Sequence, residues 1–433
     1  MKIAYVSHVL SVHDYRFLKK LSESQHCVWL ITYYSGRELP ANILNLPNIT
    51  IIHRYLHSKW NPRRYMDRRA LRLLPYHVAS RTFVGAVKRS RLLQKWVAYN
   101  DWPQSRRRIL RMHSASSLGA LQFYDHIARV LCSIKPDIVH AGWVQMDGLL
   151  TALADFHPFL LMPWGSDILL DPGESAEIMA VTQYTLTKAD MITCDCESVK
   201  TRIIEISGVP PEGIVVIPWG IDLSLFNPSY DGNCVRKKLG WSGKKVLIMT
   251  RSLAPVYGVE FFLQALPYII AREPDTRALV LGSGPLDAQL RDAATKLGLS
   301  NHVHFAGFIL NDQLPQYLNA ADIYVSTSLS DGTSLSLLEA MACALPVIVT
   351  DVPSNSEWVQ EGSNGFIVPR GDPVAVAEKT LVLMKDVALA KRMGHSNLAI
   401  ARARADWEKN FAKFELMYLD LAARYPRVAH VRH

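Results

Sequence analysis

The stretch from residue 326 to residue 358 constrains the fold of this chain most, because it places a small-residue turn and a helix between two apolar strands. The short runs Ile323 to Val325 and Val347 to Thr350 are β-branched and bounded by turn residues, which is typical of parallel strands buried on both faces. Between them, the loop Ser-Asp-Gly-Thr-Ser precedes an apolar helical pattern that begins at Leu335. The sequence therefore predicts a strand-loop-helix-strand unit of an α/β sheet.

The loop of this unit is suited to bind an anion. The N–H groups at the start of a helix have no partner inside the helix, and they can face a phosphate above the sheet edge. Glu339 lies eight residues after Asp331, one to two turns into the helix, where its carboxylate can accept hydrogen bonds from the vicinal hydroxyls of a ribose. A structural interpretation is equally open, because Ser336 and Glu339 fit the capping-box pattern and Asp331-Gly332 is an ordinary turn.

Length and composition indicate a globular protein of two domains. The chain has 433 residues, of which 49% are hydrophobic and 20% charged. No run approaches the roughly 18 consecutive apolar residues of a membrane span. The N-terminus enters a strand without the layout of a signal peptide, so we expect a cytoplasmic location. The cysteines are scattered, and the close pair Cys194 and Cys196 lacks metal or redox spacing, so we expect no metal site.

Positive charge is concentrated in one segment. Residues 54–111 contain sixteen Lys or Arg and two Asp, a local charge of +14, whereas the whole chain carries +9. Aromatic side chains are interleaved with these basic residues, which suits an amphipathic segment on an anionic membrane surface. A solvated helical face without a partner is the alternative interpretation. Nucleic-acid binding has the least support, because none of the recognised reader motifs is present.

The first half of the chain opens with the pattern of a βαβ unit: strand 2–7, helix 15–22 and strand 27–33. The loop that contains His13 and Asp14 has no glycine-rich turn, so these two side chains are its candidates for orienting a ligand. Asp14 can equally serve as a helix N-cap. Further on, strand 159–162 runs into Pro-Trp-Gly-Ser-Asp, at the carboxyl end of a strand, where open α/β sheets hold their ligands.

The stretch from Asp331 to Glu339, followed by Ala-Met-Ala, resembles the donor-binding signature of the retaining glycosyltransferases of family 4. Two acidic residues are separated there by seven others, and the first acid is Asp here rather than the usual Glu. The resemblance implies an α/β fold of two Rossmann-like domains facing a cleft, the GT-B architecture, with a C-terminal helix that crosses back to the first domain. We expect the boundaries at 1–225 with the basic insert 54–111, 226–404 and 405–433.

The same resemblance assigns the donor site to the second domain. Arg251 matches the Arg of the family's phosphate-binding element, whereas Tyr257 stands where the family has Lys, so one positive charge near the leaving diphosphate is absent. Asp331 is expected to hold the sugar hydroxyls and Glu339 the ribose. The other expected donor-binding residues are Gly282, Gly284, Phe308, Ile309, Gly332, Thr333, Ser334 and Leu335.

On the acceptor side, the resemblance singles out the loop after strand 159–162. Asp167 is expected to orient the acceptor hydroxyl or the sugar, and a structural N-cap role is its alternative. Trp164 replaces the family's His, so it offers a ring face for stacking but no proton transfer. Gly165, His13 and Asp14 complete the expected acceptor or sugar side.

The resemblance implies transfer of a sugar, with retention, from a nucleoside diphosphate sugar to an acceptor hydroxyl, in which the leaving phosphate takes the acceptor proton. The expected catalytic residues are Asp167, Arg251 and Asp331. We expect no cofactor and no metal, because a helix dipole and an Arg can stabilise the leaving group. The expected partners are the nucleotide sugar and a glycan or lipid-linked acceptor, reached peripherally on the inner membrane face.

Two other functions stay open at this point. A non-catalytic relative would bind a sugar nucleotide or polyanion without turnover, which fits the replacements at Trp164 and Tyr257. A sugar-nucleotide epimerase or hydrolase on the same fold would need further acid or base groups, and it would not depend on an acceptor.

Overall fold

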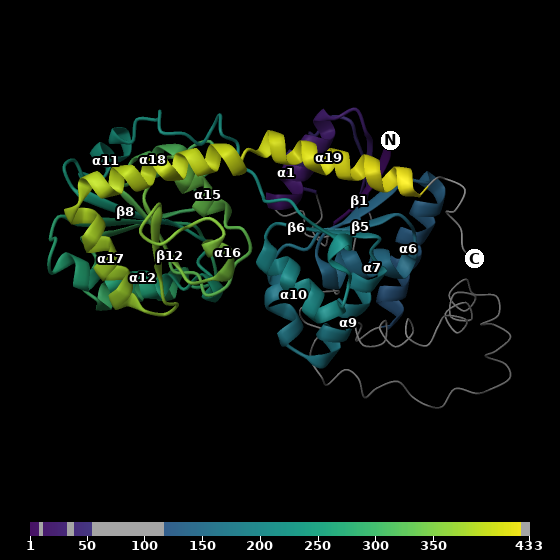
Figure 1. The fold of residues 1–433 in the computed structure, drawn as a ribbon, viewed down its shortest axis with the longest axis horizontal. Helices are drawn as coiled ribbons and strands as arrows, with labels where there is room; N and C mark the ends of the chain where they lie inside the picture. Colours follow the sequence, from purple (N-terminus) through teal and green to yellow (C-terminus); the bar gives the residue numbers. More distant parts are fainter. Residues whose placement is uncertain (8–11, 33–38, 54–116, 426–433) are drawn as a thin grey trace. The chain divides into compact units, whose positions relative to one another are not determined.

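The computed structural model describes residues 1–7, 12–32, 39–53 and 117–425, which form two compact α/β units (Figure 1). The first unit comprises residues 1–193, 202–215 and 417–433, and the second comprises residues 194–201 and 216–416. The basic segment 54–111 lies outside the described residues. The predictions made for it therefore stay predictions.

The first unit is built on a seven-stranded sheet with the strand order β3-β2-β1-β4-β5-β6-β7. Its strands are β1 (Lys2–Val6), β2 (Cys27–Thr32), β3 (Ile49–His53), β4 (Ile138–Ala141), β5 (Phe159–Leu161), β6 (Met191–Cys194) and β7 (Ile214–Val216). The neighbouring pairs from β3 to β6 run parallel. Every residue of β4, β5 and β6 is buried, as expected for strands covered on both faces.

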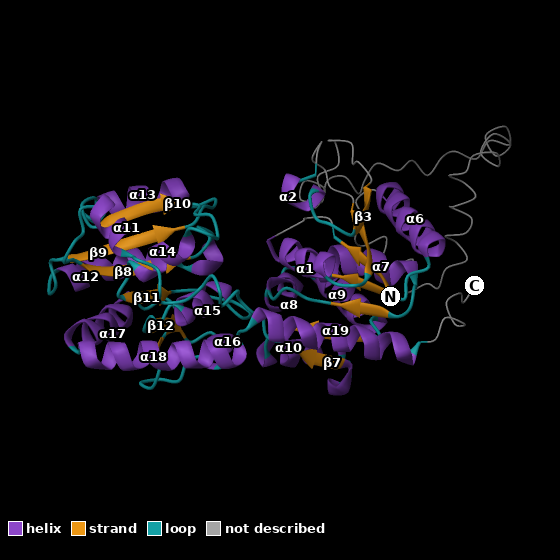
Figure 2. Ribbon diagram, turned by 90° about the horizontal axis from the view of Figure 1, so that it is seen from above, coloured by secondary structure: helices purple, strands orange, loops and turns teal. Residues whose placement is uncertain are grey.

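Helices cover this sheet (Figure 2). They are α1 (Val12–Glu23), α2 (Ala41–Leu44), α6 (Ser117–Ile134), α7 (Leu149–Ala154), α8 (Ser166–Leu169), α9 (Ala176–Lys188) and α10 (Glu197–Ser207). Helix α1 begins three residues earlier than predicted, so the expectation that His13 and Asp14 lie in a loop is wrong. An Asp in the first turn is favourable because it faces the positive end of the helix dipole.

The second unit contains a six-stranded sheet with the order β10-β9-β8-β11-β12-β13, and all its neighbouring pairs are parallel. Its strands are β8 (Lys245–Thr250), β9 (Thr276–Leu281), β10 (Val303–Gly307), β11 (Ile323–Ser326), β12 (Val347–Thr350) and β13 (Gly365–Val368). Because parallel strands all point the same way, the loops after β8, β9, β10 and β11 lie at one edge of the sheet. This edge holds the residues predicted to bind the donor.

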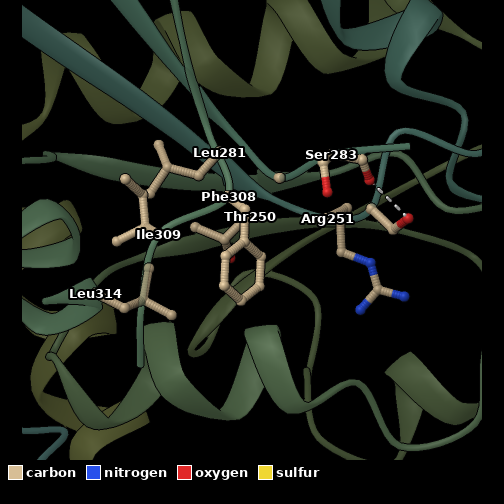
Figure 3. Close-up of a pocket in the computed structure, with 9 residues that line it drawn as sticks. Thr250, Arg251, Leu281, Ser283, Phe308, Ile309 and Leu314 are labelled. Carbon is tan, nitrogen blue, oxygen red and sulfur yellow. Dashed lines mark hydrogen bonds between the residues drawn. The ribbon is translucent and has the colours of Figure 1, made fainter. Parts of the chain in front are cut away.

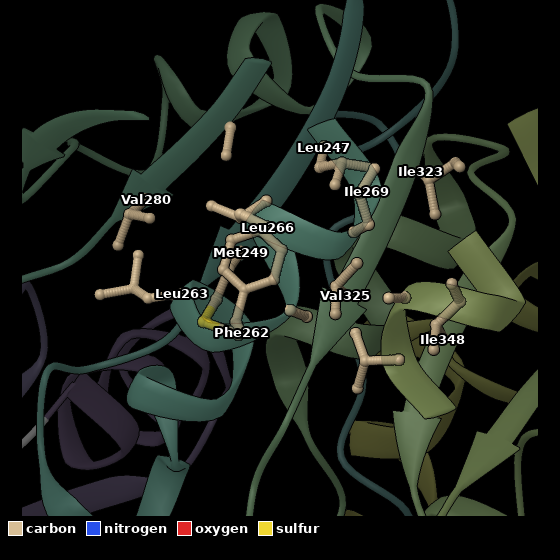
Figure 4. Close-up of a cluster of buried hydrophobic side chains, with 14 of the residues drawn as sticks. Leu247, Met249, Phe262, Leu263, Leu266, Ile269, Val280, Ile323, Val325 and Ile348 are labelled. Atoms are coloured by element: carbon tan, nitrogen blue, oxygen red, sulfur yellow. The ribbon is translucent and has the colours of Figure 1, made fainter. Parts of the chain in front are cut away.

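Two apolar layers sandwich the second sheet. Its helices are α11 (Asn233–Lys238), α12 (Val259–Ile270), α13 (Asp287–Lys296), α14 (Leu314–Asn319), α15 (Leu335–Ala342), α16 (Pro353–Ser356), α17 (Pro373–Lys385) and α18 (Val387–Arg404). Leu247 and Met249 of β8 pack in one layer with α12 (Figure 4), whereas Val246 and Ile248 pack in the other with α15. This alternation follows from the two-residue period of a strand.

The last helix, α19 (Trp407–Arg424), supplies residues to both units. Tyr418 on this helix is fully buried, and its hydroxyl lies 2.6 Å from Nδ1 of His140 in β4. The prediction that the C-terminal helix returns to the first domain is therefore confirmed.

Candidate functional site

A serine at the end of the loop between β11 and α15 caps the N-terminus of α15. Ser334 has an extended backbone, and its Oγ accepts a hydrogen bond from the N–H of Leu337 at 3.3 Å. Ser334 is thus the N-cap residue, which satisfies one of the N–H groups at the helix start. The interpretation of Ser336 and Glu339 as a capping box is wrong, because Ser336 is already the second residue of the helix.

Arg251 joins the end of β8 to this loop. Its Nη1 donates to Oγ of Ser334 at 2.6 Å and to Oγ of Ser336 at 2.8 Å, and its Nη2 donates to Oδ2 of Asp331 at 2.6 Å. The guanidinium carbon lies 4.1 Å from the centre of the Tyr257 ring. Only 8% of Arg251 is exposed. The structure thus brings together four residues that the sequence predicted separately: Arg251, Tyr257, Asp331 and Ser334.

One donor of the guanidinium has no protein acceptor. Nε of Arg251 is buried, and within the described part of the chain it has no hydrogen-bond partner. A buried N–H of a charged group is costly when it is unpaired, so it is an available donor for an anionic ligand. Arg251 also lines a cavity, which places this charge where a ligand can bind.

This cavity, of about 310 Å³, lies among the loops that follow β8, β9 and β10. Figure 3 shows the apolar side chains of Leu281, Ile309 and Leu314 on one side of Phe308, and the guanidinium of Arg251 on the other. Phe308 is 69% exposed, so its ring is available for stacking. The cavity therefore offers an aromatic, apolar end and a cationic end, which suits a nucleotide.

Two glycines allow the chain to pass close to itself beside the cavity. Gly282 has a φ of +130°, and a Cβ there would overlap the carbonyl oxygen of Arg251. A Cβ on Gly284 would overlap the carbonyl oxygen of Leu253. Gly282 lines the cavity, and the donor-binding role expected of Gly284 stays a prediction. Leu335 and Glu339 lie half-buried in the first and second turns of α15, and their contacts with a donor stay predictions.

The turn at Gly332 and Thr333 is held by Asp195, a residue that the sequence reasoning missed. The N–H of Thr333 donates to Oδ2 of Asp195 at 2.7 Å, and the Thr333 hydroxyl donates to the Asp195 carbonyl at 2.8 Å. A Cβ on Gly332 would lie 2.7 Å from the same carboxylate oxygen. These partners are separated by 138 positions, so no local pattern indicates the contact.

In the first unit, the side chain of Asp167 is hydrogen-bonded to the backbone of the loop after β5. It is completely buried, and its carboxylate accepts hydrogen bonds from the N–H groups of Trp164 at 2.8 Å and Val144 at 3.1 Å. Burial raises the pKa of Asp167 to about 7. Gly165 has a φ of +106°, which favours glycine. These contacts are structural ones; the prediction that Asp167 orients the acceptor stays untested.

Asp14 is also enclosed by protein. It is 3% exposed, and its Oδ1 accepts a hydrogen bond from the Tyr5 hydroxyl at 3.0 Å. Trp164 is half-buried, and its indole lies so close to Gly142 that a Cβ there would overlap it. For His13 the structure describes only the backbone, in the first turn of α1. The ligand-binding roles of these residues stay predictions.

Three other features bear on the chemistry. Cys194 and Cys196 are free and buried, and burial raises the pKa of both thiols, so neither is a reactive thiolate.

Among the described residues, no group of His, Cys, Asp and Glu side chains is arranged to hold a metal ion. Over those same residues, every helix is too short or too polar to cross a membrane.

Comparisons with known proteins fit this geometry. Residues 234–398 match the family described as glycosyl transferases group 1, and residues 103–196 match the family described as glycosyl transferase 4-like. HepE from Anabaena, solved in complex with UDP-glucose, has a TM-score of 0.71 at 19% identity and covers 97% of this chain and 100% of its own. Sucrose-phosphate synthase from Thermosynechococcus elongatus has a TM-score of 0.73 at 18% identity, covering 98% of this chain and 100% of its own.

Among curated relatives, the D-inositol 3-phosphate glycosyltransferase of Streptomyces bingchenggensis is 25% identical over 67% of this chain and 66% of its own length. The GDP-mannose-dependent alpha-(1-6)-phosphatidylinositol monomannoside mannosyltransferase of Mycolicibacterium smegmatis is 28% identical over 52% of this chain and 61% of its own length. The chain therefore spans somewhat less than two thirds of these relatives.

The two units with their parallel sheets, together with the likeness to HepE and sucrose-phosphate synthase, place the chain in the GT-B fold class. Within that class, the two family matches are decisive. The chain belongs to the glycosyltransferases of family 4 type.

Proposed function

We propose that this protein transfers a sugar from a nucleoside diphosphate sugar to a hydroxyl group of a glycan or lipid-linked acceptor. The observation that carries the proposal is Arg251, a buried cation between the N-terminus of α15 and a cavity with an exposed aromatic ring. The names of the relatives support the donor class, since one is GDP-mannose-dependent and the structure of HepE contains UDP-glucose. They also support the acceptor class, because one acts on a phosphatidylinositol mannoside.

In the proposed complex the nucleobase lies against Phe308 and Ile309, and the diphosphate lies between Arg251 and the first turn of α15. The positive charge of Arg251 and the N–H groups of Leu335 and Ser336 would stabilise the diphosphate as negative charge develops on it. Asp331 and Glu339 would hold the sugar and ribose hydroxyls. Because Arg251 and the helix N-terminus supply the positive charge, we expect turnover without a divalent cation.

The reaction would proceed on one face of the sugar. The bond between the anomeric carbon and the diphosphate oxygen breaks, and the acceptor oxygen forms its bond to the same face of that carbon. The acceptor proton moves to the leaving phosphate oxygen. This mechanism predicts retention of the anomeric configuration, which NMR of the first product formed would test.

The test of the proposed function is donor binding and slow donor hydrolysis across UDP-glucose, UDP-N-acetylglucosamine and GDP-mannose. We compare wild type with Arg251→Gln, and use Arg291→Gln as the control, because Arg291 is an exposed arginine of α13 outside the cavity. We expect one donor to bind and hydrolyse, with at least tenfold weaker binding in Arg251→Gln and no change in Arg291→Gln. Binding without turnover, with any acceptor supplied, would instead indicate a non-catalytic relative.

A further inference from the structure

Residues 194–201 are tied to the donor side of the second unit by two carboxylates. Asp195 accepts the N–H of Thr333 at 2.7 Å, and Glu357 accepts the N–H groups of Glu197 and Ser198, each at 3.1 Å. The contact of Glu357 satisfies the start of α10 as a cap would. The contact of Asp195 differs from that of Glu357 because its carboxylate is hydrogen-bonded to Thr333, in the loop that carries Asp331 and Ser334.

The Thr333 amide is closed to a ligand in this arrangement. Thr333 is 5% exposed and Asp195 is 3% exposed, so the carboxylate fills the space directly beside the amide. The other side of the turn is also held, because the hydroxyl of Ser354 donates to the carbonyl of Asp331 at 3.0 Å. The turn is therefore shaped by protein groups, and the residues on either side of it contact Arg251.

We propose that Asp195 is a positioning residue of the donor site, whose ionised carboxylate holds the Gly332-Thr333 turn so that Asp331 and Ser334 meet Arg251. This inference rests on the proposed function, because it concerns the same donor loop. A hydrogen bond from an N–H to a charged carboxylate is about twice as strong as one to a neutral acceptor. The shape of the donor loop is therefore set by the charge of a residue that lies far from it in the sequence.

The surroundings of Asp195 make this charge sensitive to pH. Burial, together with the nearby charge of Asp331, raises the pKa of Asp195 to about 6. The groups that face it are Asp331, which is paired with Arg251, and the thiol of Cys196, which lies 3.4 Å from Oδ1. Among the described residues, Glu197 and Lys200 carry charges near the adjacent Cys194, and Glu357 carries one near Cys196.

Donor binding should therefore weaken as the pH falls through about 6, because protonation replaces the charged hydrogen bond to Thr333 by a neutral one. A nucleotide sugar is the appropriate probe. The diphosphate of a nucleotide sugar is esterified at both ends, so it does not titrate near this pH. The terminal phosphate of UDP or GDP has a second pKa of about 6, so its own titration would obscure that of Asp195. UDP-glucose and GDP-mannose are therefore used in place of UDP and GDP.

The decisive comparison is between wild type and Asp195→Asn, with Glu197→Gln as the matched control. Glu197 is exposed, and the same charge is removed there two residues away without touching the donor loop. Binding of both nucleotide sugars is measured by calorimetry from pH 5 to pH 8. We expect Asp195→Asn to bind about tenfold more weakly than wild type at pH 7.5, to equal it at pH 5, and to show no inflection near 6. Glu197→Gln should follow wild type.

Two results would overturn the inference. Asp195→Asn could follow the wild-type pH profile, in which case the charge has no role. It could also bind more tightly at pH 7.5, in which case the carboxylate blocks the Thr333 amide from the donor.

Hydrogen exchange of the peptide that contains residues 331–334 separates failure of this inference from failure of the proposed function. If neither nucleotide sugar binds wild type at any pH, the proposed function fails for these donors, and the exchange measurement decides the role of Asp195. Protection that rises above about pH 6 in wild type, and is absent in Asp195→Asn, supports the inference. Equal protection in both proteins overturns it.

Discussion

The guanidinium of Arg251 lies over the ring of Tyr257, with its central carbon 4.1 Å from the ring centre. In the glycosyltransferases that this chain resembles, a second cation stands in place of Tyr257. Here the aromatic ring of Tyr257 contacts Arg251 and restricts the orientation of its guanidinium. A stacked arginine loses little further freedom when it binds an anion, so the tyrosine contributes by holding Arg251 in place.

This relationship predicts the effect of substitutions at position 257. Tyr257→Ala removes the stacking, worth about 1 kcal/mol, and should weaken binding of the nucleotide sugar about fivefold. Tyr257→Phe keeps the ring and should remain within about twofold of wild type. Calorimetric titration measures both. A loss in Tyr257→Phe as large as in Tyr257→Ala would mean that the hydroxyl, and not the ring, is what the donor requires.

The ion pair between Arg251 and Asp331 predicts a stability effect. Arg251→Gln leaves the Asp331 carboxylate, whose side chain is 16% exposed, without its cation, and should lower the free energy of unfolding by about 3 kcal/mol. The double variant with Asp331→Asn should recover most of this loss, because no unpaired charge remains. Thermal unfolding of the three proteins is the measurement. Equal losses in the single and double variants would contradict the ion-pair explanation.

Asp167 predicts a pH dependence of stability. Its pKa is raised from 3.8 to about 7 by burial, so between pH 4 and pH 7 the folded state binds more protons than the unfolded state. Stability contributed by this group therefore falls as the pH rises through that window, by at most about 4 kcal/mol. Asp167→Asn should lack this fall. The measurement is the slope of the free energy of unfolding against pH in wild type and in Asp167→Asn. The substitution also changes the acceptor for the Trp164 and Val144 N–H groups, but that shifts the free energy by the same amount at every pH. Identical slopes in the two proteins would contradict the prediction.

The hydrogen bond between Tyr418 and His140 predicts a loss of stability in the first unit. Burial lowers the pKa of His140 to about 3, so the ring is neutral, and within the described part of the chain its Nε2 has no partner. Tyr418→Phe also leaves Nδ1 unsatisfied and should cost about 1 to 2 kcal/mol in urea unfolding. Adding His140→Phe should restore part of this stability. Tyr425→Phe, at a less buried tyrosine hydrogen-bonded to Asp190, is the control with the smaller expected loss.

The basic segment 54–111 predicts membrane binding. Reversing the charge of Arg63, Arg64, Arg68 and Arg69 removes eight units of positive charge in total from the segment, and each basic residue near an anionic surface contributes about 1 kcal/mol. We expect cosedimentation with vesicles that contain phosphatidylserine to be lost, and to fall with salt in wild type. Unchanged binding after the four reversals would exclude this segment as the docking surface.

The sequence predicted the parts of this structure that local patterns determine. The strands around Ser326 and Thr350, and the helix from Leu335, follow from short β-branched runs and a small-residue turn, and all of them are present. The choice of Ser336 as a cap was wrong because two serines stood at suitable positions. Only the backbone conformation distinguishes them, and Ser334 is the one with an extended conformation.

The candidate site was predictable where the residue types themselves carry the chemistry, as in Arg251 and Asp331. The sequence did not indicate that these two residues pair with each other, nor that Asp195 holds the Thr333 amide. Both contacts join positions about 80 or more residues apart. Arg251 and Asp331 follow β8 and β11, which lie side by side in the second sheet, and spacing along the chain does not encode this order. Asp195 follows β6, which is not a strand of that sheet, so its contact with Thr333 has no signal in the strand pattern either.

Tyr418 also has a consequence for the order in which the protein is made. The first unit contains residues 1–193 and 202–215, yet its core includes a phenol from residue 418 that meets His140. On the ribosome, about two hundred residues of the second unit are synthesised before that phenol appears. The contact that satisfies Nδ1 of His140, and with it this part of the first unit's core, can therefore form only after residue 418 has been synthesised.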